Sequence, residues 1–358
     1  MQMCTQSLTI IAMDHCWTYP YGKIRYEMNF DVQAVPAPPN LIRALRTGFD
    51  AITNHMGLIL IPISIDLLLW FGPHLQVKTL LEGILQQLNS FTAASTEESQ
   101  EVLRLSQAYW SEVAQRINLF AALRSLPVGI PSLMVSRQPL ATPIGTPGFW
   151  EVTSLSAVVG TWLLLTLIGL LLGTFYFMVV AQASLNNKVS WVQTLVAWPA
   201  VSLKVLLLAL LWFALLVAIS IPASCLVTLV ALTGFGGGTL PILIFGSIML
   251  WLFFPLIFSP HGIFANQRTM WGSVTDSVRL TRLTLPTTGL LIIVFLLISE
   301  GTDFLWNTPA DSSWLTMLAL AGHAFITTGL LAASFVYYRD ATRWTQRLIQ
   351  QAKLSSIT

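Results

Sequence analysis

Charged residues are scarce in this chain. They make up 9% of its 358 residues, whereas a typical soluble domain carries about 25%. A soluble protein with so few charges would expose large apolar patches and aggregate, but a bilayer solvates apolar surface directly. The hydrophobic fraction of 54% and the mean hydropathy of +0.70 agree. Together these values predict an all-α polytopic membrane protein rather than a soluble domain.

Cysteines and catalytic motifs are equally sparse. The three cysteines, Cys4, Cys16 and Cys225, form neither a CxxC pair nor a disulfide framework. The sequence holds no His-Glu-x-x-His zinc motif and no Gly-x-Ser-x-Gly nucleophile elbow. A net charge of +2 gives no indication of a nucleic-acid partner. We therefore expect a protein that is not an enzyme and that has no metal and no cofactor.

Six stretches are long and apolar enough to cross about 30 Å of hydrocarbon. The first covers residues 51–71, and the other five form a bundle within residues 151–338. The approximate limits of these five are 153–181, 204–222, 240–258, 287–306 and 314–338. The sequence thus predicts six transmembrane helices.

The third of these stretches belongs to a longer apolar run that requires a break. From residue 201 to residue 232 it would measure about 48 Å as one helix, which is too long for a straight span. Pro222 is where a kink is expected. Gly236, Gly237 and Gly238 then form a predicted hinge. They are not a phosphate-binding loop, because no strand precedes them and no Lys-Ser/Thr follows.

Basic residues are distributed unevenly around the six stretches. Thirteen of the 18 lysines and arginines lie at the two termini or in the connections at residues 182–204 and 259–286. The remaining five lie between residues 72 and 150. Because basic residues concentrate on the cytoplasmic side, we predict a multi-pass protein of a bacterial inner membrane with both termini in the cytoplasm. Tryptophans near both ends of the stretches agree with this topology.

The N-terminal segment, residues 1–50, is predicted to be a cytoplasmic tail. Its apolar run is too short for a signal peptide and lacks a basic start. Met28 is a candidate alternative start, because nothing before it carries a fold signal.

The long connection at residues 72–150 is predicted to be extracytoplasmic. Apolar residues recur at helical spacing over residues 81–91 and again over residues 102–120. Ser95 and Glu98 form a capping-box pattern at the start of the second helix. This indicates an extracytoplasmic helical hairpin followed by a Pro-rich loop, expected to be extended. The loop is either a cap over the outer helix ends or a lid that binds a ligand or partner.

Two segments on the opposite side have amphipathic character. In residues 267–284, Trp271, Val274, Val278 and Leu280 are expected to face lipid while Arg279 and its neighbouring charges face water. The C-terminal segment, residues 339–358, is predicted to form a second amphipathic helix along the headgroups.

The segments that are predicted to lie on the cytoplasmic side carry a family resemblance. Phe264-Ala265 and the run from Trp271 to Arg282 resemble the cytoplasmic segment of the bacterial membrane-domain family found beside glycerophosphodiester phosphodiesterases. The run from Ser334 to Asp340 is similar to the end of that family's last helix. The resemblance covers roughly residues 190–340. It implies a membrane domain of a family whose membrane part has no established chemistry. The phosphodiesterase catalytic domain is absent here, because no stretch offers its His/Glu/Asp metal ligands.

A second resemblance points to a different class of protein. Importer permeases of ATP-driven transporters have a cytoplasmic coupling helix, and Gly272 with Leu283-Thr284-Leu285-Pro286 echoes its ending. The acidic start of that helix is missing, since Asn266-Gln267-Arg268 stands there instead.

Four ionisable residues fall inside the predicted membrane region, where charge is costly. They are Asp66, Glu300, Asp303 and His323, all in the outer half of their helices. One hypothesis is that they converge on a proton or cation site. The alternative is that the three acids reach the interface while His323 bonds a neighbouring helix.

These observations favour a non-enzymatic membrane protein that acts as a scaffold, as an assembly or accessory subunit, or by interacting with lipid. Its expected partners are membrane lipids and other membrane-protein subunits. The alternative is a permease or transporter component with a polar site in the outer leaflet. Small residues such as Gly160, Gly169 and Gly173 are expected to permit close helix contact.

Overall fold

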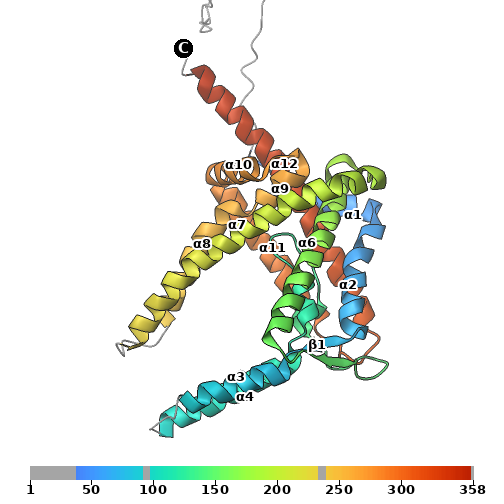
Figure 1. The fold of residues 1–358 in the computed structure, drawn as a ribbon. Helices are drawn as coiled ribbons and strands as arrows, with labels where there is room; N and C mark the ends of the chain where they lie inside the picture. Colours follow the sequence, from blue (N-terminus) through green and yellow to red (C-terminus); the bar gives the residue numbers. More distant parts are fainter. Residues whose placement is uncertain (1–37, 92–96, 233–238, 356–358) are drawn as a thin grey trace, which may run out of the picture. The chain divides into compact units, whose positions relative to one another are not determined.

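A computed structural model describes residues 38–91, 97–232 and 239–355, and these residues are predominantly helical (Figure 1). Five helical segments are long and apolar enough to cross a membrane, and a bent helix pair near the N-terminus raises the count to six if it forms one span. The predicted all-α membrane class is therefore confirmed. The Gly236–Gly238 hinge lies outside the described residues.

Four of the predicted stretches appear as helices close to their expected positions. α6 (Leu155–Asn186) and α11 (Leu285–Trp306) begin within about two residues of the predicted limits. α8 (Thr239–Phe253) continues through the 3₁₀ turn η3 (Phe254–Leu256) into α9 (Ser259–Asn266). α12 (Thr316–Ser355) combines the sixth stretch with the predicted C-terminal amphipathic helix in one uninterrupted element. The apolar part of α12 therefore passes directly into its basic part.

The first predicted stretch is not a single straight helix. α1 (Leu41–Asn54) ends at His55, and the 3₁₀ turn η1 (Met56–Ile59) leads into α2 (Leu60–Phe71) at an angle of 91°. α1 also takes in residues 41–50, which the sequence assigned to the tail. It packs closely on α12, because Gly48 lies directly against the Ala333 backbone. This packing holds α1 away from the axis of α2.

The third stretch begins earlier than predicted. α7 (Trp191–Leu232) is one helix of 42 residues that contains Pro199 and Pro222. The predicted start near Lys204 is wrong, and beyond Pro222 the helix continues to the end of the apolar run at Leu232. Prolines are tolerated inside membrane helices where neighbouring groups compensate for the lost hydrogen bonds. The early start is anchored by Gln182, whose side chain contacts both Ser190 and Thr194 across the turn from α6.

Helices of the bundle differ strongly in how much of their apolar surface is covered. In the most apolar stretch of α12, 67% of the residues are buried, and in that of α6 56%. The corresponding share is 11% for both α7 and α11. The main apolar cluster includes Tyr176, Phe177 and Phe335 and joins α6, α9 and α12. The core of the described bundle therefore lies around α6 and α12.

The end of the bundle that carries the long connection is here called the loop end. The segment after α2 forms strand β1 (His74–Gln76), which pairs in parallel with β2 (Phe149–Glu151) just before α6. This small sheet was not predicted. α3 (Lys78–Phe91) and α4 (Glu97–Arg116) contact one another. Ser95 and the rest of the connection at 92–96 lie outside the described residues, so the predicted hairpin stays a prediction.

The second helix of this pair is shorter than the sequence indicated. α4 ends at Arg116, so the predicted continuation to residue 120 is wrong. Asn118 ends it: its side-chain oxygen accepts hydrogen bonds from the backbone N–H groups of Leu75 and Phe120, at 3.1 Å each. The chain then turns into the 3₁₀ helix η2 (Leu119–Leu123).

The opposite end, here called the basic end, includes α9 and α10 (Met270–Leu283). α10 was expected to turn Leu280 toward lipid, but Leu280 is only 3% exposed and packs in an apolar cluster with Phe258 and Tyr337. The buried face of α10 consists of Ser273, Ser277, Leu280 and Thr281. Small polar residues allow this short helix to lie close against η3 and α9.

Candidate functional site

Residues 119–137, here called the inserted segment, run into the bundle rather than over it. The segment consists of η2, a Pro-containing irregular stretch and the single-turn helix α5 (Met134–Arg137). Val128, Ile130 and Leu133 are each at most 2% exposed. The predicted Pro-rich stretch is irregular over residues 127–133, but there it is buried in the bundle and does not lie on the surface.

Two glycines of α6 make room for this segment. A Cβ at Gly169 would lie 2.3 Å from the Leu123 carbonyl oxygen, and one at Gly173 would lie 2.0 Å from that of Val128. Gly173 is 18 residues beyond the start of α6, about 27 Å along the helix. The glycines thus permit close contact with irregular backbone of the same chain, whereas Gly160 faces open space.

Asp66 holds the tip of the inserted segment. Its carboxylate is 0% exposed and accepts hydrogen bonds from the Ser132 hydroxyl at 2.5 Å and from the Met134 N–H at 3.0 Å. A third bond comes from the Leu133 N–H at 3.3 Å. These N–H groups begin α5 and have no partner within that helix. Asp66 therefore caps α5 from α2, and irregular backbone deep in a membrane protein requires such a partner.

Arg137 locks the other end of the segment. Its guanidinium donates to the backbone carbonyl oxygens of Trp306 at 3.3 Å and Pro309 at 2.6 Å, and it pairs with the Asp311 carboxylate. The Arg137 side chain is only 8% exposed. The Trp70 indole N–H also donates to the Asp311 carbonyl at 3.0 Å. This lock was not identified from the sequence, where the only hint was that Arg137 and Asp311 carry opposite charges on one predicted side.

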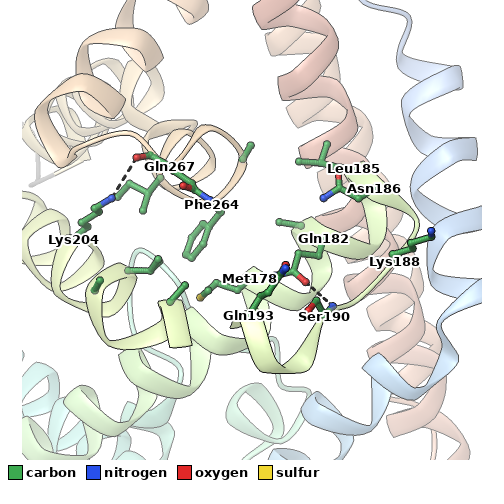
Figure 2. Close-up of a pocket in the computed structure, with 16 residues that line it drawn as sticks. Met178, Gln182, Leu185, Asn186, Lys188, Ser190, Gln193, Lys204, Phe264 and Gln267 are labelled. Carbon is green, nitrogen blue, oxygen red and sulfur yellow. Dashed lines mark hydrogen bonds between the residues drawn. The ribbon is translucent and has the colours of Figure 1, made fainter. Parts of the chain in front are cut away.

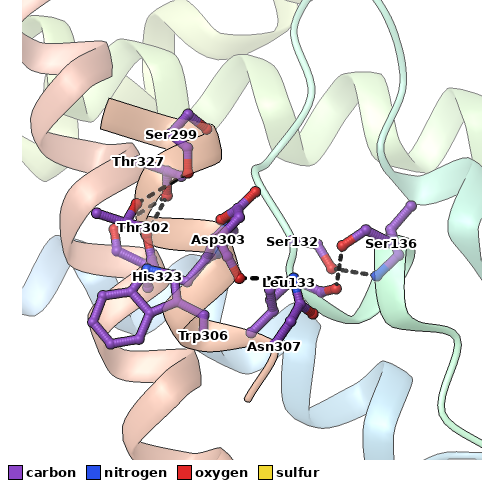
Figure 3. Close-up of polar contacts among 12 residues, drawn as sticks. Ser132, Leu133, Ser136, Ser299, Thr302, Asp303, Trp306, Asn307, His323 and Thr327 are labelled. Carbon is purple, nitrogen blue, oxygen red and sulfur yellow. Dashed lines mark hydrogen bonds and ion pairs between the residues drawn. The ribbon is translucent and has the colours of Figure 1, made fainter. Parts of the chain in front are cut away.

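Asp303 and His323 form the second polar feature of this region (Figure 3). His323 Nε2 lies 3.8 Å from Asp303 Oδ1, so α11 and α12 bring the two groups together across their interface. Asp303 Oδ1, His323 Nδ1 and Trp306 Nε1 are buried without a hydrogen-bond partner among the described residues. Trp306 packs against Gly322 of α12 and against the apolar cluster that includes Leu133 of the inserted segment.

The four residues singled out in the sequence have different sets of direct partners. Asp303 and His323 meet, Asp66 has its own set of partners, and Glu300 is exposed one turn away on α11. Arg124 of the inserted segment acts electrostatically on Asp66, Asp303 and His323.

A serine and a histidine meet at the basic end. His261 Nε2 lies 2.7 Å from the Ser334 hydroxyl oxygen, which also lies 2.7 Å from the Leu331 carbonyl oxygen. These buried contacts join α9 to α12. Within the described residues, no group of three or more His, Cys, Asp or Glu side chains is arranged to hold a metal ion.

Comparisons with known proteins identified no relative of this chain. Neither protein-family models, nor curated proteins, nor solved structures gave a match to the chain. The function must therefore be argued from the geometry of the chain itself.

Proposed function

We propose that the protein is a six-span, non-enzymatic membrane protein that acts as a scaffold or accessory subunit and interacts with lipid. The bent pair of α1 and α2 forms the first span, and both termini lie in the cytoplasm. Thirteen of the 18 lysines and arginines lie at the termini and in the connections at residues 182–204 and 259–286, and five lie between residues 72 and 150. This uneven distribution supports the assignment of the loop end, with α3 and α4, to the outside.

The topology is testable by labelling single cysteines with a membrane-impermeant reagent in a cysteine-free background. A cysteine at Lys78, at the start of α3, should react from outside. A cysteine at Arg347, an exposed residue of α12, should react only after the membrane is permeabilised. Labelling of both positions from the same side would refute the topology.

The observation that carries the scaffold proposal is how the polar groups of the bundle are used. Asp66 and Arg137 both bond to the chain's own backbone, so they hold the inserted segment in place. The large apolar faces of α7 and α11 remain uncovered within the described residues. In a bilayer such faces contact lipid chains or the helices of another membrane protein. A rigid core with uncovered apolar faces fits a protein that works by binding other membrane components.

The test of this role is purification from the native membrane in a mild detergent or in copolymer discs. We expect lipid or another membrane protein to co-purify in a fixed molar ratio. A protein that carries neither, yet conducts protons or cations in liposomes, would overturn the proposal.

A permease is the second candidate, and one observation favours it. Asp303 and His323 face each other within the bundle with unpartnered polar atoms, next to irregular backbone and a broken first span. Broken helices and ionisable pairs of this kind occur in transporters. If the pair carries protons, flux into liposomes should be lost in D303N and H323Q. E300Q, an exposed site one turn from Asp303, should retain the flux.

The two resemblances drawn from the sequence remain predictions. The α10 surface that would contact a partner includes Trp271, which is 64% exposed, and the exposed Arg279 and Arg282. If α10 is a coupling helix, an ATPase subunit should co-purify with the wild type and be lost in R279E/R282E. Retention of such a subunit by that variant would argue against docking through α10.

A further inference from the structure

A groove of about 570 Å³ lies between α10 and the C-terminal part of α12 at the basic end. Two guanidinium groups of α10 line it, beside a mainly apolar wall contributed by Val274, Val278, Leu283 and Ile349. No acidic side chain of the described residues lines this groove. Positive charge beside apolar surface suits a ligand that has an anionic head and an apolar body.

The two guanidinium groups, those of Arg279 and Arg282, are close enough together to contact one anion. Residues three apart on a helix have their Cβ atoms about 5–6 Å apart on one face. Neither arginine has an ion-pair or hydrogen-bond partner in the part of the chain that the structure describes. The one acid of α10, Asp276, pairs with Arg268 at 3.1 Å instead. A phosphate between the two arginines would therefore gain charge-assisted hydrogen bonds from donors that the protein does not use itself.

The opposite face of α10 fixes the orientation of this helix. The Ser273 hydroxyl donates to the Ser259 carbonyl oxygen. The Ser277 hydroxyl donates to the Pro255 carbonyl oxygen at 2.7 Å and accepts from the Phe258 N–H at 3.2 Å. These contacts tie α10 to η3 and α9, so that its two arginines stay exposed on the side of the groove.

A larger cavity at the basic end lacks a comparable pair of cations (Figure 2). It measures about 680 Å³ and lies between α6, α7 and α9. Its two lysines, Lys188 and Lys204, lie at opposite ends of the cavity, and Lys204 already donates to the Gln267 carbonyl oxygen at 3.3 Å. One phosphate cannot contact both lysines. The close spacing of two cations therefore distinguishes the α10 groove from this cavity.

The position of α10 in the chain places the groove at the membrane boundary. α10 lies between two helical segments that are long and apolar enough to cross a membrane, one ending at Asn266 and the other beginning at Leu285. Leu283, which lines the groove, is 45% exposed, and Leu290 and Leu297 of α11 are 53% and 68% exposed. An uncovered apolar surface for an acyl chain thus begins beside the groove. Basic pockets between membrane helices are known to bind anionic headgroups.

We propose that the α10 groove binds the phosphate headgroup of an anionic phospholipid, with Arg279 and Arg282 as its cationic contacts. The glycerol and upper acyl carbons lie against Leu283 and Ile349. The inference rests on the proposed lipid-interacting function and names the lipid class and its site. A free phosphate shares the charge chemistry, but it would leave the apolar wall without a partner.

The test compares lipid retention by the purified full chain in discs that contain phosphatidylglycerol or phosphatidylcholine, measured by native mass spectrometry. R279Q/R282Q should weaken retention of phosphatidylglycerol about twentyfold, because each basic residue near an anionic surface contributes about fivefold. R279K/R282K keeps both charges and should retain most of the binding. R43Q/R46Q removes two exposed arginines with the same spacing from α1, outside the groove, and should have little effect.

Ile349→Gln distinguishes a lipid from a free phosphate. It should weaken retention of phosphatidylglycerol about threefold, the value of about one buried CH₂, and leave the binding of inorganic phosphate unchanged. Millimolar phosphate should not displace the lipid. If phosphate does displace it and binds with the same dependence on the two arginines, the lipid assignment is wrong.

Two further outcomes separate this site from the proposed function. If R279Q/R282Q and wild type retain phosphatidylglycerol equally, the site is wrong, although retained lipid would still support the proposed function. If a protein subunit co-purifies through the two arginines and no lipid depends on them, the groove is a protein-docking site and the lipid assignment is overturned. Absence of any bound lipid or partner would count against both proposals.

Discussion

The two ends of the molecule use their charges in opposite ways. At the loop end, Asp66 is fully buried and the Arg137 side chain is 8% exposed, and both bond to fixed backbone groups. At the basic end, Lys188, Arg343 and Arg347 are exposed, and the Arg46–Asp50 pair spans 3.9 Å with its side chains 84% and 67% exposed. Burial therefore separates charges that determine the structure from charges that remain available to a ligand.

The physical basis of this difference is the cost of leaving a buried group unpaired. An exposed ion pair contributes about 0–1 kcal/mol because water solvates either partner alone. A buried donor that loses its acceptor costs about 1–3 kcal/mol, and more when charge is involved. Substitutions of the buried charges should therefore reduce stability, whereas those of the exposed charges should change it little.

The largest expected effect is that of Asp66→Ala. It leaves the Ser132 hydroxyl and the Leu133 and Met134 N–H groups without their acceptor in the interior of the bundle. We expect the free energy of unfolding to fall by about 3–5 kcal/mol. Reversible unfolding in mixed micelles measures this change in the free energy of unfolding. D50N, at an exposed carboxylate, is the control, and a loss in D66A no larger than in D50N would refute the capping role.

Removing the lock at Arg137 should have the next largest effect. R137A deletes the contacts to Trp306, Pro309 and Asp311, and we expect a loss of about 2–4 kcal/mol. R116A provides the matched control, because Arg116 pairs with Glu112 at 3.3 Å on an exposed face of α4 and should lose less than about 1 kcal/mol. Equal thermal midpoints for R137A and R116A would contradict the expected difference in stability between losing a buried arginine and losing an exposed one.

Gly173→Ala tests the insertion of residues 119–137 directly. The new methyl group would meet the Val128 carbonyl oxygen, so the segment must shift, at a cost of about 1–3 kcal/mol. Gly160 lies on the same helix with nothing within 4 Å of a Cβ, and G160A should change stability by less than about 1 kcal/mol. Accessibility of a cysteine at Val128 to an impermeant reagent should rise in G173A and stay low in G160A.

The sequence predicted those elements whose signals are local. Ser154 accepts a hydrogen bond from the Ala157 N–H and so begins α6 near the expected residue. Pro286 at the first turn of α11 is equally typical of a helix start. Uninterrupted apolar residues then make each helix long enough to cross a membrane. The fold class and the approximate helix boundaries can therefore be predicted from residues that are close together in the sequence.

What the sequence did not predict depends on contacts between distant residues. The prolines between 127 and 139 indicated extended surface chain, because nothing local shows that Gly173 and Asp66 make room for the segment and cap it. The packing of α1 on α12 likewise depends on distant residues, since Gly48 packs against Ala333, some 285 residues away. Asp66 was correctly recognised as unusual, but its partners were not predictable. Candidate sites inside membranes thus require the fold before their roles can be assigned.

The smallest effect concerns pH at the loop end. His74 is 3% exposed and its Nε2 lies 3.1 Å from the Leu69 carbonyl oxygen; burial lowers the pKa of this imidazole below its ordinary 6.5. The unfolded chain therefore binds a proton more readily than the folded one. Stability should be full above about pH 6.5 and should decline as the pH falls below it, by at most about 1.4 kcal/mol per pH unit.

The matched pair for this prediction is H74Q and H55Q, with thermal midpoints measured at pH 7.5 and pH 5.5. Glutamine at position 74 can donate to the Leu69 carbonyl but does not titrate, so H74Q should lose less stability in acid than the wild type. H55Q leaves His74 in place and should keep the wild-type pH dependence. If all three proteins decline equally, His74 does not couple folding to pH, and the buried polar groups of the loop end affect stability only through their hydrogen bonds.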